Sequence, residues 1–89
     1  MLMILIHPEN NKCANIKISS IGTVKHHWPE KGSLVTLGIW TMDGRFFVVL
    51  IDDPTAIPKI AEEVFDGTRT VLKLPWRAAN APDINDIND

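Results

Sequence analysis

The sequence predicts an α+β domain: a mainly antiparallel sheet of about five strands with a single helix packed on one face, in the order β-β-β-β-α-β. Three observations lead to this prediction. Two runs rich in β-branched and aromatic residues, 34–42 and 45–52, flank an Asp-Gly pair. One stretch after Pro54 spaces its apolar residues for one face of a helix. The 89 residues, 45% hydrophobic and 22% charged, have the composition of one globular domain.

The first two strands are predicted at residues 2–6 and 15–24, before a loop at 25–32. The first run contains only Leu, Met and Ile. The apolar alternation of the second run changes phase between Ile18 and Ile21. A bulge or a bend is therefore expected at the two serines between them.

The hairpin over residues 34–52 is the strongest signal in the sequence. Its Asp-Gly pair favours a two-residue type I′ turn, in which both turn positions have positive φ. That turn places Trp40 opposite Phe47 and Ile39 opposite Val48. One face of the hairpin is then mostly aliphatic, whereas the other combines Trp40 with Phe47.

The helix is predicted to begin after Thr55 as its N-cap and to end before Gly67, which suits a left-handed C′ position. With this cap, Pro58 falls at the third helical position, where its missing N–H costs little. The alternative cap, Asp53, would place Pro58 inside the helix. The apolar stripe of the helix consists of Ile57, Ile60, Ala61, Val64 and Phe65.

The last strand is predicted at residues 69–74, and Pro75 ends it or places it at an edge. Residues 1–77 then form one α+β domain. Residues 78–89 form an acidic tail, which is predicted to be disordered because it has few large apolar side chains.

The composition excludes several classes of function. Nine basic and eleven acidic residues give a net charge of −2, which excludes a strongly basic nucleic-acid coat or a polybasic membrane arm. The single cysteine, Cys13, excludes an intrachain disulfide framework. The apolar run at residues 1–6 is too short for a signal peptide or a membrane helix. We therefore expect a cytoplasmic protein with a reduced cysteine and no membrane contact.

The second face of the hairpin has no helix to cover it. Its Trp40 and Phe47, with Arg45 at the rim, match the composition of protein interfaces. The alternative is a sheet that closes on itself as a small barrel. We expect a non-enzymatic binding or regulatory module that acts by protein–protein contact through a homodimer, with Trp28 as an exposed recognition residue.

A nucleic-acid-binding module is the alternative function. The loop KHHWPEKG surrounds Trp28 with basic and histidine side chains, a pattern typical of single-strand binding. These side chains are Lys25, His26, His27 and Lys31. Trp76 would be a second stacking surface, and the basic patch would extend over Arg45, Arg69, Lys73 and Arg77.

A small metal- or thiol-dependent enzyme is the third class. Its candidate metal ligands are His7, Cys13, His26 and His27. Their spacing, H-x5-C-x12-HH, lacks the close ligand pairs of structural zinc sites. No sequence feature near Cys13 activates its thiol. We therefore predict that the protein is not an enzyme and binds neither a metal nor a cofactor.

Overall fold

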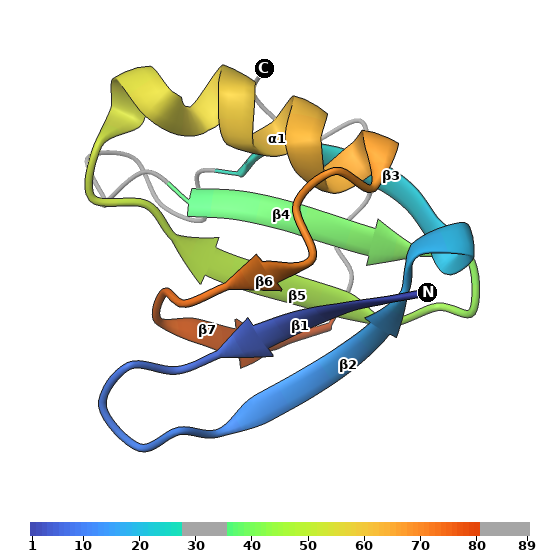
Figure 1. Ribbon diagram of the computed structural model, residues 1–89, viewed down its shortest axis with the longest axis horizontal. Coiled ribbons are helices and arrows are strands. Elements are labelled where there is room, and N and C mark those ends of the chain that lie inside the picture. Colours follow the sequence, from blue (N-terminus) through green and yellow to red (C-terminus); the bar gives the residue numbers. More distant parts are fainter. Residues whose placement is uncertain (28–35, 81–89) are drawn as a thin grey trace.

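The computed structural model describes residues 1–27 and 36–80. Two sheets form two layers, and helix α1 (Ile57–Asp66) lies along one side of them (Figure 1). The strand order is β2-β1-β6 in one sheet and β3-β4-β5-β7 in the other. The strands are β1 (Leu2–Ile6), β2 (Cys13–Lys17), β3 (Ile21–His27), β4 (Thr36–Thr41), β5 (Phe46–Leu50), β6 (Val71–Leu72) and β7 (Trp76–Ala78).

The α+β class, the mainly antiparallel pairing and the single helix are confirmed for the described residues. The prediction of one sheet of about five strands is wrong, because the strands divide between two sheets. The predicted element order changes as well, since five strands precede the helix and two follow it. Among the described strands, the only parallel pair joins β1 to β6.

The expected irregularity after β2 is a change of sheet. A 3-10 turn (Ile18–Ser20) separates β2 from β3. The Ser20 hydroxyl donates to the Lys17 carbonyl at 2.8 Å, and the Ile21 N–H donates to the Ile18 carbonyl. This turn lets Ile16 and Ile21 both reach the core, although they belong to different sheets. The phase change in the sequence therefore marks the end of one strand and the beginning of another.

The β4–β5 hairpin has a three-residue loop. The Thr41 N–H donates to the Arg45 carbonyl at 3.0 Å, and the Gly44 N–H donates to the Thr41 carbonyl at 3.1 Å. Gly44 is the one residue of this loop with positive φ, at 90°. The predicted type I′ turn, which needs positive φ at two residues, is therefore wrong. A three-residue loop needs only one left-handed residue, and glycine adopts that conformation without steric cost.

The longer loop shifts the hairpin register by one residue. Ile39 pairs with Phe47, and Trp40 pairs with Phe46. Because side chains alternate along a strand, the shift decides which residues share a face. Phe47 faces the core with Ile39, whereas Trp40 packs with Phe46 and Val48 on the opposite face. The predicted face that combined Trp40 with Phe47 is therefore wrong.

The main core lies between the two sheets and is closed on one side by α1. Met3 and Leu5 of β1 meet Leu37 and Ile39 of β4 in one cluster. The helix adds Ile57 and Val64, which are both fully buried. Other fully buried side chains are Ile16 and Val49. The predicted helix stripe is confirmed for Ile57 and Val64, and Ile60 and Ala61 pack against the same core. It is wrong for Phe65, which is 57% exposed.

The helix begins differently from the prediction. Asp53 caps a 3-10 turn (Pro54–Ala56), and its Oδ1 accepts from the Thr55 N–H at 3.1 Å and the Thr55 hydroxyl at 2.7 Å. The prediction of Thr55 as the cap is therefore wrong. The inserted turn leaves Pro58 in the first turn of α1, where it removes no helical hydrogen bond. The left-handed Gly67, with φ of 81°, is confirmed.

The chain changes sheets again at Pro75. Instead of one strand at 69–74, β6 pairs with β1 and β7 pairs with β5. The Pro75 carbonyl accepts from the Leu50 N–H at 2.9 Å, so the proline lies at the start of the new pairing. β7 includes Ala78, the first residue of the predicted tail. Ala79 and Asn80 of that tail are described as well, whereas residues 81–89 lie outside the described residues.

Candidate functional site

The clearest exposed apolar surface is the outer face of the three-stranded sheet. β1 is apolar on both faces: Met3 and Leu5 are fully buried, and the alternate residues face outward. Leu2 is 45% exposed, and Val71, which pairs with Ile4 across the sheet, is 47% exposed. We call these outward residues the outer stripe; they are Leu2, Ile4, Ile6 and Val71. This stripe is aliphatic throughout.

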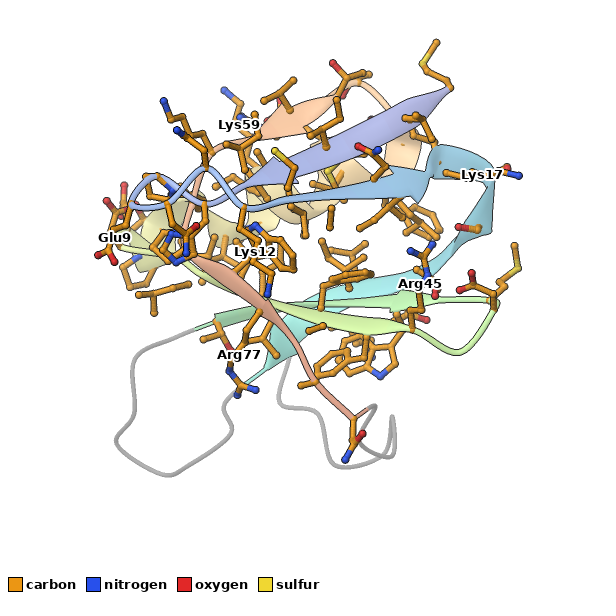
Figure 2. All side chains as sticks on the ribbon, turned by 90° about the horizontal axis from the view of Figure 1, so that it is seen from below. Glu9, Lys12, Lys17, Arg45, Lys59 and Arg77 are labelled. Carbon is orange, nitrogen blue, oxygen red and sulfur yellow. The ribbon has the colours of Figure 1, made fainter. Side chains whose placement is uncertain are left out.

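A polar row borders the outer stripe along β2. Ile6, Ile4 and Leu2 pair with Cys13, Asn15 and Lys17 respectively, which are all exposed. Figure 2 shows this sheet at the top, with its side chains projecting upward and Lys17 at one end. An apolar centre with a polar border is the usual anatomy of a protein interface.

A second exposed surface lies on the side of the molecule opposite α1, where β2 and β7 are edge strands (Figures 1 and 2). We call it the open side. The Trp76 Nε1–H of β7 donates to the Lys12 carbonyl at 3.0 Å. Arg45 Nη1 donates to the Asn15 carbonyl at 3.5 Å. These two side chains connect the sheets on the side that the helix leaves uncovered.

Aromatic rings hold two cations at the open side. Lys12 Nζ lies 5.2 Å from the ring centre of Trp76, and Arg45 Cζ lies 5.5 Å from that of Phe47. The two rings meet edge to face at 6.0 Å. Cation–π contacts of this kind keep the charged heads at the surface while the rings stay in the core.

The perturbed carboxyl groups of the described chain belong to turns. The Thr41 hydroxyl, followed by Arg45 at 3.2 Å, holds the pKa of Asp43 below its usual value. The hydroxyl and N–H of Thr68 lower the pKa of Asp66 in the same way. Both carboxyl groups are exposed and stabilise local turns, so neither indicates a catalytic pocket.

The predicted partner residues do not form one surface. Phe47 is buried in the core at 4% exposure, whereas Trp40 is 6% exposed on the other face of the sheet. Arg45 is exposed at the open side. Trp28 lies outside the described residues. The structure thus leaves Arg45 as the one described member of the predicted set that is accessible.

The predicted nucleic-acid residues are only partly described. Lys25 lies in β3 and is half-buried. His26 and His27 belong to the same strand, but their side chains, like Lys31, lie outside the described residues. Trp76 is 8% exposed, so the prediction that it offers a stacking surface is wrong. Arg69 forms an ion pair with Glu63 at 2.8 Å and adds little positive charge to a patch.

Three further observations bear on function. In residues 1–27 and 36–80, no group of three or more His, Cys, Asp or Glu side chains is arranged to hold a metal. Within the same ranges, no helix has the length and apolar character needed to cross a membrane. Comparison with known proteins found no family model, no curated protein and no solved structure that matches this chain.

Sequence reasoning missed the outer stripe, although its signal was present. Residues 2–6 are all apolar, and a strand without polar alternation has an apolar side chain on each face. Such a strand is either buried on both faces or leaves one face uncovered. The structure has the second arrangement, since Leu2 is exposed while Met3 is buried.

Proposed function

We propose that this chain is a non-enzymatic binding module that acts by protein–protein contact, and that the outer stripe is its contact with a second copy. The observation that carries the proposal is the exposure of aliphatic side chains on a regular sheet face, nearly half for both Leu2 and Val71. Exposed apolar patches of this kind commonly mark interaction surfaces.

The chemistry of the outer stripe favours a second copy as the partner. Its four side chains carry no charge and no hydrogen-bonding group. The surface therefore needs no opposite charge or matching polar group on its partner, and the same surface of a second copy can pack against it. Burying aliphatic surface contributes about 25 cal/mol per Å². Lys17, at the border, can keep its ammonium group in water while its stem covers the rim.

The test compares two double variants. Leu2→Gln/Val71→Gln makes the outer stripe polar without changing its charge. Met42→Gln/Phe65→Gln is the matched control, because both residues are large, apolar and exposed but lie outside the stripe. Sedimentation and light scattering across a concentration series measure the dimer.

We expect the wild type and the control to dimerise alike, and the stripe variant to raise the dissociation constant about tenfold or more. A wild type that stays monomeric at about 100 μM would contradict the proposal. So would a control that dissociates as readily as the stripe variant.

A further inference from the structure

We propose that the outer edge of β2, which pairs with no other described strand, accepts an extended acidic segment of another protein as an added strand. This inference goes beyond the homodimer, since it uses the lateral edge of the three-stranded sheet and a partner of different chemistry. It depends on two independent features of the open side, the direction of backbone groups and the distribution of charge.

The backbone direction follows from the β1–β2 ladder. The Ile18 N–H donates to the Met1 carbonyl at 3.1 Å, and the His7 N–H donates to the Lys12 carbonyl at 2.9 Å. Hydrogen-bonded pairs alternate with non-bonded pairs along an antiparallel ladder. Even-numbered residues of β2 therefore bond to β1, and odd-numbered residues direct their N–H and C=O groups away from it. The odd-numbered residues are Cys13, Asn15 and Lys17.

These outward groups form a template for another strand. Two carbonyls among them accept side-chain donors: Asn15 from Arg45 at 3.5 Å, and Lys17 from Ser20 at 2.8 Å. The first bond is at the long limit for a hydrogen bond, so an incoming N–H displaces it at little cost. β2 contains no proline or bulge and is regular over its length, which leaves its edge open to pairing.

Charge selects the partner. Residues 51–70, which include α1, contain two basic and five acidic residues, a net charge of −3. The other described residues contain six basic and two acidic residues, a net charge of +4. Figure 2 looks onto the open side, where Lys12, Lys17, Arg45 and Arg77 lie along or beside the two edge strands. Of these four, Arg45 alone has a carboxylate partner among the described residues.

A strand added to β2 would meet positive charge on both of its faces. Its side chains alternate between the outer face, beside Lys17, and the inner side, beside Lys12, whose ammonium group lies 5.2 Å from the ring centre of Trp76. Acidic side chains on either face of the added strand therefore lie near a basic residue of this chain, whereas basic side chains are repelled. Phosphate groups would also be attracted to this charge, but only a peptide backbone matches the alternating N–H and C=O groups of an edge strand.

The experiment uses a fluorescent peptide of alternating Glu and Val, with fluorescence anisotropy as the readout. The decisive comparison is the same peptide with alternate backbone amides methylated, which keeps every charge but blocks pairing along one edge. We expect methylation to weaken binding about tenfold or more, since several backbone hydrogen bonds are lost. Equal binding of the two peptides would overturn strand addition.

The protein side of the test is Asn15→Pro. This change removes an outward N–H and leaves the ladder to β1 intact, as proline at an edge strand does. Asn15→Thr is the matched control because it keeps the N–H. We expect Asn15→Pro to lose about tenfold in peptide affinity and Asn15→Thr to lose none. If Asn15→Pro unfolds, the methylated peptide still decides the question.

Two further probes separate the alternatives. A peptide with Lys in place of Glu should not bind, and equal binding would contradict selection by charge. A single-stranded oligonucleotide that binds more tightly than the peptide, and is insensitive to Asn15→Pro, would reassign the open side to phosphate binding. The Leu2→Gln/Val71→Gln variant should still bind the peptide, so failure of the homodimer and failure of strand addition are distinguishable.

Discussion

Gly38 is the residue on which the packing of the second aromatic cluster depends. A Cβ at this position would lie 2.5 Å from Cη2 and Cζ3 of Trp40 and 3.0 Å from Cε1 of Phe46. The centres of those two rings are 4.4 Å apart, so the indole of Trp40 cannot move toward Phe46 to make room for a methyl group. The missing side chain of Gly38 is what lets the indole of Trp40 lie against the strand.

We therefore expect Gly38→Ala to destabilise the fold by about 1–3 kcal/mol through overpacking. Gly22→Ala is the matched control, since its Cβ would first meet Cγ of Met42 at 3.3 Å, and that side chain is exposed and flexible. Urea unfolding measures both. Equal losses in the two variants would contradict the packing argument.

Thr41 sets the acidity of Asp43 through its single hydroxyl proton. Thr41 Oγ1 accepts from the Arg45 N–H at 2.9 Å, and its hydroxyl has two acceptors in reach, the Asp43 carboxylate and the Arg45 carbonyl at 3.1 Å. The charged carboxylate is the stronger acceptor of the two, so the hydroxyl donates to it. This bond favours the charged form and lowers the pKa of Asp43 below its usual 3.8. Its stabilising contribution is present above that value and is lost as pH falls through the lower folded pKa.

We expect Thr41→Val to raise the pKa of Asp43 toward its usual value and so to remove this acid-side contribution. Carboxyl-carbon NMR titration measures the change. Asp66 is an internal control in the same spectra, because Thr68 lowers its pKa and the mutation does not touch that turn. An unchanged Asp43 titration would show that Thr41 is not the cause.

Among the elements, the helix start decides between two capping residues, Asp53 and Thr55. Asp53 accepts two hydrogen bonds from Thr55, and the 3-10 turn that they stabilise leads directly into α1. Two prolines within one turn of each other, Pro54 and Pro58, each occupy a position where no helical N–H is needed. The local sequence thus favours an inserted turn over an earlier helix start.

We expect Asp53→Ala to cost about 1 kcal/mol of stability, the usual effect of removing a cap. Thr55→Ala should cost less, because the Thr55 N–H can still donate to Asp53. Thermal unfolding at neutral pH compares the two variants. The opposite order would restore Thr55 as the cap.

The hairpin shows the limit of prediction at this scale. The existence of β4 and β5 was predictable from their β-branched and aromatic residues. The register was not, because Asp-Gly fits either a two-residue turn or the end of a three-residue loop. The bonds between Thr41, Asp43 and Arg45 stabilise the longer loop. Because the loop is one residue longer than predicted, Trp40 and Phe47 lie on opposite faces of the sheet and not on the same face.

At the scale of the whole molecule, the last described strand ties the two layers together. β7 pairs with β5, and the Ala79 N–H extends this ladder by donating to the Phe46 carbonyl at 3.1 Å. Trp76, on the same strand, reaches the Lys12 carbonyl in the other layer. The fold therefore uses residues beyond position 77, where the sequence predicted its end.

A chain that ends at Arg77 should accordingly be less stable than one that ends at Asn80, by about 1–2 kcal/mol for the lost ladder bonds. Chemical denaturation of both truncated chains measures the difference. Identical midpoints would mean that Ala78 and Ala79 contribute nothing to the sheet.

Features that depend only on neighbours in the chain can be predicted from the amino-acid sequence. The apolar spacing of α1, the left-handed Gly67 and the breaks near Ser19 and at Pro75 follow from helical periodicity and backbone sterics. The apolar character of the β1 part of the outer stripe can also be predicted from residues 2–6, which are all apolar. These signals are short-range, so they survive without knowledge of the fold.

Three features depend instead on contacts between distant segments: the sheet that each strand joins, the face that each hairpin residue takes, and the apolar surface that stays exposed among the described residues. β6 lies beside β1 although more than sixty residues separate them in the chain. Such pairings are selected by the burial of whole faces, to which distant segments contribute together. For the same reason, the exposed surface proved to be the outer stripe of β1 and β6, and not the hairpin face that carried the stronger aromatic signal.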